Sequence, residues 1–398
     1  MFRNRVAYTF VLLGAVVFIY CAGNEVAALL LYSLLLLPVA SLIFLLCSLP
    51  FFQASQGLDR DCVDKGGSAV VHVSLHNRGP LYFPFIMVHF YQNKGAFGAF
   101  FRTEPTALPP RALSRREAVS ACLYAGRFRV GVSRIWVSDL CGLFLLPVQR
   151  APLTLYVCPR VTKVPVPPEL IGLTHRESYN RREQMGEGSE FHSIREYQPG
   201  DLIKRVHWGL TAKTGALQVR QLRRTPDPTC TILLDPRRTA GPESRRILMN
   251  DGLLCCTISL AAAFLEEKIP VKLLFWDGAP RSEALLSAAD LRHGQNCLAQ
   301  ADFSDTFTLG SLMLTYWQQL MNCRSVMAVT LDDGGELDGQ LFELERLWCS
   351  VTVCQVALPG QQPGGAGLLL QKSGIGVCRY MVGTGEFRLL SGEGGGDK

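Results

Sequence analysis

The chain begins with two long apolar runs, which constrain its fold more than any other feature. The runs extend from Val6 to Ala22 and from Val26 to Leu49, and only Gly23, Asn24 and Glu25 separate them. Each run is close to the ~20 apolar residues that an α-helix needs to cross a bilayer. A cleaved signal peptide or lipoprotein signal is disfavoured because a second apolar run follows the first. The sequence therefore predicts a membrane-spanning helical hairpin over residues 1–52.

The charges that flank the two runs predict how the hairpin is oriented. Arg3 and Arg5 precede the first run, Arg60 and Lys65 follow the second, and Glu25 is the charge in the turn. Lys and Arg accumulate in the cytoplasmic loops of membrane proteins. We therefore expect a cell-membrane protein with two spans, whose N-terminus and soluble domains both lie in the cytoplasm.

Composition excludes several classes for the rest of the chain. Among 398 residues, 40 Lys and Arg stand against 34 Asp and Glu, and the charged residues make up 19%. So mild a surplus does not indicate a nucleic-acid-binding arm, and the low charged fraction argues against general disorder. The 14 cysteines form no CxxC pair. Zinc-ribbon and thioredoxin-like sites are therefore not predicted, and most cysteines are expected to pack as small apolar residues.

Two further domains follow the hairpin. Over residues 53–165, short β-like runs such as AVVHVSLHN and RFRVGVSRIWVS are separated by Gly, Pro and Asn, a pattern typical of a small β-sandwich. Over residues 230–390, apolar strands alternate with helices, which predicts a doubly wound, mostly parallel α/β domain. Residues 166–229 are interpreted as a linker and a motif-bearing segment, and residues 391–398 as a disordered tail.

The elements expected in the α/β domain can be placed individually. The strands are Cys230–Asp235, Val271–Trp276, Ser325–Leu331 and Ser350–Leu358, and the helical stretches are Glu243–Glu267, Glu283–Ala299, Leu309–Met321 and Leu337–Trp348.

Aspartates at the predicted strand ends suggest a metal site, but one substitution argues against it. Ligands bind beyond the carboxyl ends of strands in such sheets, where Asp235, Asp277 and Asp332–Asp333 fall. The run that starts at Asp235 resembles the DxSxS metal-binding loop of von Willebrand factor A domains, with Thr239 at the second hydroxyl position but Arg237 at the first. A guanidinium competes with Mg²⁺ for the carboxylate. We therefore predict a degenerate loop, with no metal and no cofactor bound.

The most informative stretch is residues 186–220, GEGSEFHSIREYQPGDLIKRVHWGLTAKTGALQVR. Its Pro199-Gly200 pair is typical of a type II turn, and Asp201 is placed to cap a short helix that carries Arg205 and Trp208. Asp201 and Arg205 are spaced to pair on that helix.

Two interpretations of this stretch remain open. It could be a structural clasp, with Trp208 packed into the domain, or an exposed basic and aromatic docking surface. The residues in question, which we call the signature residues, are Arg195, Tyr197, Gly200, Asp201, Arg205, Trp208 and Lys213.

This stretch, followed by TILLD, resembles the signature of the domain-of-unknown-function 58 family. Glu190 and Ala212 match it in addition to the signature residues, and the run GRFRVGVSRIWVSDLCGLF over Gly126–Phe144 resembles a second family motif, with Leu140 and Cys141 in place of Pro and Phe. The resemblance implies a bacterial membrane hairpin, a β-domain and a von Willebrand factor A-like domain. It also implies association with a MoxR-type AAA+ ATPase in the assembly or maturation of other proteins.

We therefore expect a non-enzymatic, membrane-anchored adaptor or scaffold that contacts the ATPase or its client protein. The sequence has no GxxxxGK[ST] loop, no GxSxG elbow and no HExxH motif, and no small-molecule substrate is evident. One alternative is a hydrolase that uses Cys and His. Another is a weak nucleic-acid binder, because residues 176–224 contain ten Lys or Arg against six Asp or Glu. No nucleic-acid-binding module surrounds these charges, so nucleic acid is not expected as a partner.

Overall fold

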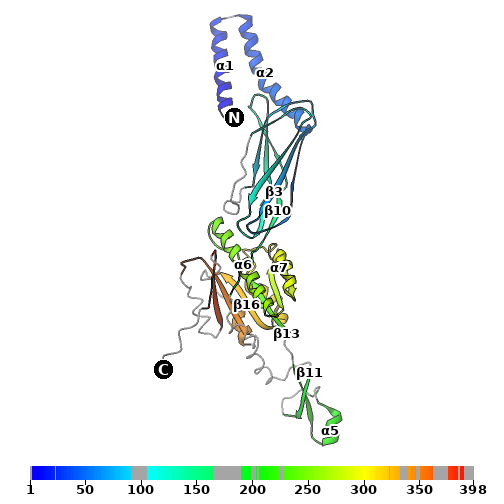
Figure 1. Ribbon diagram of the computed structural model, residues 1–398. Coiled ribbons are helices and arrows are strands. Elements are labelled where there is room, and N and C mark those ends of the chain that lie inside the picture. Colours follow the sequence, from blue (N-terminus) through cyan, green and yellow to red (C-terminus); the bar gives the residue numbers. More distant parts are fainter. Residues whose placement is uncertain are drawn as a thin grey trace. The chain divides into compact units, whose positions relative to one another are not determined.

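The computed structural model describes residues 2–22, 24–91, 105–164, 190–198, 203, 206–223, 227–321, 323–331, 339–346, 350–361, 375–383 and 386–389. The protein is a mixed α/β chain with two apolar N-terminal helices and several sheets (Figure 1). It divides into two compact units, Met1–Val157 and Cys158–Lys398.

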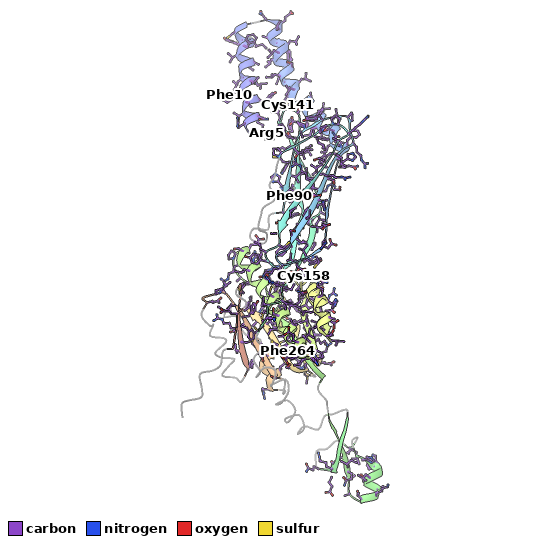
Figure 2. The ribbon with its side chains drawn as sticks, in the orientation of Figure 1. Arg5, Phe10, Phe90, Cys141, Cys158 and Phe264 are labelled. Carbon is purple, nitrogen blue, oxygen red and sulfur yellow. The ribbon has the colours of Figure 1, made fainter. Side chains whose placement is uncertain are left out.

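The two N-terminal helices have the length and composition of membrane spans. They are α1 (Phe2–Ala22) and α2 (Glu25–Ser48), and a short 3-10 turn, η1 (Leu49–Phe51), follows them. Apolar side chains such as Phe10 and Leu36 are exposed along both helices (Figure 2). A helix that shows apolar side chains all round fits a lipid environment. The helices are therefore consistent with the predicted membrane anchor.

The rest of the first unit consists of largely antiparallel sheets, and its strands alternate apolar and polar side chains, as strands with one buried face do. In β3 (Ser68–Asn77), for example, Val71, Val73 and Leu75 are buried, and the residues between them are more exposed. The sheet orders are β1-β3-β6, β2-β10-β7 and β5-β4-β8-β9. The other strands are β1 (Phe52–Leu58), β2 (Cys62–Asp64), β4 (Phe83–Phe90), β5 (Thr106–Leu108), β6 (Leu113–Ala121), β7 (Gly126–Val130), β8 (Val132–Ser138), β9 (Leu145–Gln149) and β10 (Leu153–Cys158).

The second unit is built on a seven-stranded sheet of order β15-β14-β13-β16-β17-β18-β19. Neighbouring strands from β14 to β18 run parallel, and the two edge strands are antiparallel. The strands are β13 (Asp227–Leu234), β14 (Val271–Trp276), β15 (Pro280–Leu285), β16 (Cys323–Leu331), β17 (Ser350–Ala357), β18 (Gly376–Met381) and β19 (Phe387–Leu389). Strand β13 is the first of these seven strands along the chain, and it lies inside the sheet. The later strands are added on both sides of it, so the order of the strands reverses between β13 and β16.

Helices cover both faces of this sheet. Residues of α8 (Leu309–Thr315) and α10 (Gly339–Arg346) form one buried cluster with Val351 and Val353 of β17. Cys256 of α6 (Glu243–Glu266) contacts Cys354, whose side chain points to the opposite face because strand side chains alternate. The remaining helices are η3 (Ala288–Asp290), α7 (Leu291–Leu298) and α9 (Trp317–Leu320).

Helix α6 is also long and apolar enough to cross a membrane, as α1 and α2 are, but its apolar window is largely buried inside the second unit. At Gly252 a Cβ would lie 2.5 Å from a methyl carbon of Val382 and 3.0 Å from one of Val356. Glycine therefore lets α6 lie close against the sheet. We assign α6 as a core helix.

One predicted element is wrong. The stretch Glu283–Ala299 was expected to be helical throughout, but Glu283 lies in the edge strand β15, which pairs with β14, and the helical part begins at η3. The run EALLSAA favours a helix locally, and pairing with the neighbouring strand overrides that preference.

Candidate functional site

The signature stretch forms a small module of its own. Strands β11 (Glu190–Glu196) and β12 (Gln218–Arg223) pair antiparallel, and the helix α5 (Trp208–Thr214) lies between them in the chain (Figure 1). Among the signature residues, Arg195 and Tyr197 lie at the end of β11 and Trp208 and Lys213 lie on α5. The predicted positions Gly200, Asp201 and Arg205 lie outside the described residues.

Helix α5 begins later than predicted. Its first residue is Trp208, and its N-cap is His207, whose Nδ1 accepts a hydrogen bond of 3.2 Å from the backbone N–H of Leu210. The prediction that Asp201 caps the helix carrying Trp208 is therefore wrong. A histidine with an unprotonated ring nitrogen can replace the usual oxygen acceptor at this position.

Local hydrogen bonds fix the other end of α5. Gly215 ends the helix in a left-handed conformation at φ 70°, which residues with a Cβ rarely adopt. The hydroxyl of Thr211 accepts a hydrogen bond of 3.0 Å from the backbone N–H of Gln218, at the start of β12. In addition, the N–H of His207 donates to the carbonyl of Gln218 at 2.7 Å. These contacts hold α5 to β12 through atoms that belong to the module itself.

The outer side of α5 is open to solvent. Trp208 is 63% exposed, Lys213 is exposed, and α5 contains no buried residue. Trp208 is therefore not packed into the domain, contrary to the structural-clasp interpretation. Protein interfaces enrich tryptophan at their centres, whereas lysine is depleted there and suits the polar rim. We call Trp208 and Lys213 the docking pair.

A second candidate site lies where the strand order reverses, at the carboxyl ends of β13 and β16. Such a switch point is the usual ligand crevice of an open α/β sheet. Here Asp235 follows β13 and is buried, and Thr330 of β16 donates a hydrogen bond of 2.5 Å to its Oδ2. The guanidinium of Arg237 lies on the same carboxylate, with Nη2 at 2.7 Å from Oδ2 and Nε at 3.1 Å from Oδ1.

Arg237 therefore stands where a cation would be expected. Its Nη2 also donates to the hydroxyl of Thr330 at 3.1 Å, and its backbone N–H donates to Asp235 at 3.0 Å. The second hydroxyl of the DxSxS-like loop, Thr239 Oγ1, is buried and has no hydrogen-bond partner among the described residues. Because the carboxylate is already paired with a guanidinium, this loop does not fit Mg²⁺.

The remaining strand-end aspartates are Asp277, Asp332 and Asp333. Asp277 pairs with Arg281 at 2.8 Å, and Asp332 and Asp333 lie outside the described residues.

The loop of residues 139–144 contacts the two N-terminal helices. Asp139 is buried, accepts a hydrogen bond of 2.9 Å from the backbone N–H of Phe144, and accepts another from the hydroxyl of Ser41 in α2. Arg5 of α1 donates to the carbonyl of Leu143 at 2.8 Å (Figure 2). This loop therefore ties both helices of the hairpin to the β-sheets of the first unit.

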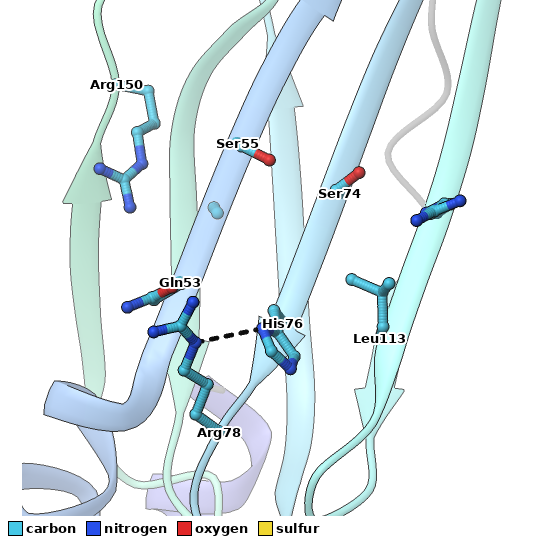
Figure 3. A pocket seen from close by; sticks show the side chains of 9 residues that line it. Gln53, Ser55, Ser74, His76, Arg78, Leu113 and Arg150 are labelled. Carbon is cyan, nitrogen blue, oxygen red and sulfur yellow. Dashed lines mark hydrogen bonds between the residues drawn. The ribbon is translucent and has the colours of Figure 1, made fainter.

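A basic cleft of about 570 Å³ opens on the outward face of the β1-β3-β6 sheet (Figure 3). Arg78 donates to His76 Nδ1 at 3.4 Å, and the buried Nε of Arg150 has no hydrogen-bond partner in the part of the chain that the structure describes. None of the lining residues carries a carboxylate, so the cleft suits an anionic group. The lining residues are Gln53, Ala54, Ser55, Ser74, His76, Arg78, Leu113, Arg115 and Arg150.

A cluster that the sequence analysis missed lies between β15 and α7. Nε2 of His293 is 3.4 Å from an oxygen of Glu283 and 3.5 Å from the sulfur of Cys297. Burial, and secondly the charge of Glu283, raise the pKa of the Cys297 thiol. The i,i+4 spacing of His293 and Cys297 was a usable signal, but Glu283 was expected on a helix rather than on the neighbouring strand.

Comparisons with known proteins identify no family. No family model matches the chain, and no curated protein matches it. Among solved structures, a CARDB domain from Pyrococcus furiosus is similar at 18% identity and a TM-score of 0.21, over 27% of this chain and 89% of that one. A β-glucosidase from Listeria innocua is similar at 13% identity and a TM-score of 0.17, over 27% of this chain and 16% of that one. Likenesses this weak support no conclusion about fold or function.

Proposed function

We propose that this chain is a non-enzymatic, membrane-anchored adaptor that docks a partner protein through the β11-α5-β12 module. The observation that carries the proposal is the exposure of the docking pair, Trp208 and Lys213, on a helix whose two ends are braced by the module's own hydrogen bonds. An ordered backbone loses little conformational freedom when a partner binds, so a braced helix is suited to docking.

The anchor of the proposed adaptor is the α1-α2 hairpin. Because α2 continues through η1 into β1, the membrane helices and the first sheet share one chain segment, and Asp139 adds a contact to Ser41. The basic cleft includes Gln53, five residues beyond the end of α2. The positive residues closest along the chain to the end of α2 are Arg60 and Lys65, within 17 residues of it, and positive charge at that distance from a span supports a cytoplasmic location, where anionic lipids attract Lys and Arg.

The partner we propose is a MoxR-type AAA+ ATPase or its client, with assembly or maturation of other proteins as the outcome. The choice of this partner depends on the resemblance of the signature stretch to the domain-of-unknown-function 58 family. The strand order of the second unit and the Asp235 loop support a von Willebrand factor A-like fold with a degenerate metal loop, and the antiparallel sheets of the first unit support a β-sandwich. A partner surface that accepts Trp208 and Lys213 would combine an apolar pocket with acidic groups.

The geometry of the Cys297 cluster disfavours the hydrolase alternative. A catalytic histidine uses one ring nitrogen for the nucleophile and the other for the carboxylate that orients it. Here the thiol and the carboxylate both face Nε2 of His293, and the pKa of the thiol is raised rather than lowered. A reactive cysteine requires a lowered pKa.

The experiment that tests the proposal is crosslinking in intact membranes. A photo-crosslinking residue placed at Lys213, followed by affinity purification and mass spectrometry, should recover an AAA+ ATPase or a protein that the ATPase acts on. A crosslinker at Lys272, on the sheet of the second unit, serves as the positional control. Equal recovery of the same proteins from both positions would refute docking through the module.

A further inference from the structure

Three side chains of different chemistry converge at the edge of the second unit's sheet. Glu283 comes from β15, and His293 and Cys297 come from α7. One oxygen, nitrogen or sulfur atom of each lies within 4.8 Å of the other two. Carboxylate, imidazole and thiolate are the three side-chain groups that bind zinc in proteins.

Two of the three separations match the edges of a tetrahedral zinc site, and the third, between the Glu283 oxygen and the Cys297 sulfur, is within 4.8 Å. With Zn–N and Zn–O bonds of about 2.1 Å and a Zn–S bond of about 2.3 Å at tetrahedral angles, the nitrogen lies about 3.4 Å from the oxygen and about 3.6 Å from the sulfur. The observed separations are 3.4 Å and 3.5 Å.

A hydrogen bond from His293 satisfies these neighbours only in part. Nε2 of a neutral imidazole carries either one proton or one lone pair, so Glu283 and Cys297 would have to share a single weak, bifurcated contact. A metal ion between the three atoms would satisfy all of them at once.

The fold brings the three side chains together without distortion. His293 and Cys297 are four residues apart on α7 and therefore lie on one face of the helix. A capping box between Ser287 and Asp290 fixes the turn that leads into the helix. At Gly294 a Cβ would lie 2.9 Å from a methyl carbon of Leu285, so the absence of a side chain lets α7 approach β15.

The surrounding charges favour a cation. Arg281 is the nearest guanidinium along β15, and it is held at 2.8 Å by Asp277. Glu283 and a deprotonated Cys297 would together balance the two charges of the ion. The His293 side chain is 60% exposed, so the fourth coordination position faces solvent.

From this geometry we infer that Glu283, His293 and Cys297 form a binding site for a zinc-like divalent metal ion. The combination of imidazole and thiolate selects Zn²⁺ and Co²⁺ over Mg²⁺ and Ca²⁺, which prefer oxygen ligands. Three protein ligands and one solvent position make a zinc site with an open coordination position. The inference departs from the sequence-based expectation that no metal is bound, and it is independent of the proposed docking function.

Cobalt titration of the full-length protein in detergent tests this site. Co²⁺ added to chelator-treated protein should give sulfur-to-cobalt charge-transfer absorption and the visible bands of tetrahedral cobalt, saturating at one equivalent, and Zn²⁺ should displace it. Cys297→Ser should abolish the charge-transfer absorption, and His293→Gln should weaken binding by at least ~10-fold.

His72→Gln is the matched control, because His72 Nδ1 lies at the same 3.4 Å from Glu117 on another sheet but has no thiol partner in the pair. This variant should bind Co²⁺ as the parent does. Urea unfolding should give the same midpoint for all three metal-free variants, because the substituted side chains are at least partly exposed. The inference is overturned if no tetrahedral spectrum forms, or if the spectrum persists in Cys297→Ser, which would place the ion on another cysteine.

Discussion

The guanidinium of Arg237 lies against the buried carboxylate of Asp235, with Nη2 2.7 Å from Oδ2. This pair occupies the switch point of the sheet, where an open α/β fold commonly binds its ligand. The protein therefore supplies its own cation at the position that the resemblance to a DxSxS loop assigns to Mg²⁺. The contact between Arg237 and Asp235 affects both the free energy of unfolding and the response to Mg²⁺, and each can be measured separately.

The first prediction concerns magnesium. The full-length protein should show no Mg²⁺-dependent change in melting temperature at millimolar ion, because Arg237 already pairs with Asp235. A specific ion at 100 times its dissociation constant would stabilise the fold by about 2.7 kcal/mol. Arg237→Ser, which restores the first hydroxyl of the pattern, should gain a Mg²⁺ response. A response of the parent protein that Asp235→Ala abolishes would contradict the degenerate-loop interpretation.

The second prediction concerns the stability that the pair provides. Arg237→Ala should lower the free energy of unfolding by about 3 kcal/mol, because it leaves a buried carboxylate without its counter-charge. Arg238→Ala is the control: Arg238 pairs with Asp305 at 2.8 Å on the exposed surface, and its loss should cost less than about 1 kcal/mol. Urea unfolding in detergent measures both. If both variants lose the same free energy of unfolding, the buried Asp235–Arg237 pair stabilises the protein no more than the exposed Arg238–Asp305 pair does.

The third prediction concerns alkaline pH. Burial raises the pKa of the Cys230 thiol from 9.0 to about 12. In the unfolded chain the same thiol ionises near its ordinary pKa, so unfolding releases a proton between about pH 9 and pH 12, and the free energy of unfolding falls as pH rises through that window. Each such thiol contributes a slope of about 1.4 kcal/mol per pH unit. Cys230→Ala should reduce the slope measured by urea unfolding between pH 9 and pH 10.5. An unchanged slope would assign the pH dependence to other groups.

Much of the fold could be predicted because its signals are local. The apolar runs of α1 and α2 and the strand Val271–Trp276 follow from hydropathy and periodicity alone, and α6 ends one residue before its predicted end. These features depend on neighbouring residues in the chain, which a sequence displays directly.

The parts that could not be predicted depend on contacts between distant segments. Glu283 lies in a strand because β15 pairs with β14, and a local run of helix-forming residues cannot reveal that pairing. Trp208 was expected to be buried if the stretch was a clasp, and its exposure depends on which segments pack against α5, which the sequence does not display. The sequence shows that Arg237 stands at the first hydroxyl position of the DxSxS-like loop. It does not show the hydrogen bond from Arg237 to Thr330, because that bond depends on β16 lying beside β13.

The fourth prediction concerns topology. With Arg3 and Arg5 on the cytoplasmic side and the turn at Asn24–Glu25 outside, residues 53–398 should be cytoplasmic. A reporter that is active only outside the cytoplasm, fused after Lys398, should be silent, and the same reporter fused within the turn should be active. Activity of the fusion after Lys398 would show that the orientation is the reverse of the predicted one. The docking pair would then lie where a cytoplasmic ATPase cannot reach it.

The last prediction is that Trp208 and Lys213 bind a partner protein and contribute little to the stability of the fold. Because Trp208 is 63% exposed, Trp208→Ala should change the free energy of unfolding by no more than about 1 kcal/mol. Trp276→Ala is the matched control, since Trp276 stacks on Phe307 with ring centroids 4.1 Å apart, and its loss should destabilise the protein by about 3 kcal/mol.

The decisive measurement is quantitative recovery of crosslinked partners from membranes, compared with the stability of each variant. The docking role predicts that Trp208→Ala and Lys213→Ala melt like the parent protein and lose most of the recovered partner at low salt, with the difference between Lys213→Ala and the parent shrinking as salt is raised, because screening weakens the same charge contact in the parent. It predicts that Trp276→Ala loses partner only in proportion to its loss of folded protein. If Trp208→Ala and Lys213→Ala melt normally and retain the full set of partners at low salt, the docking role is contradicted.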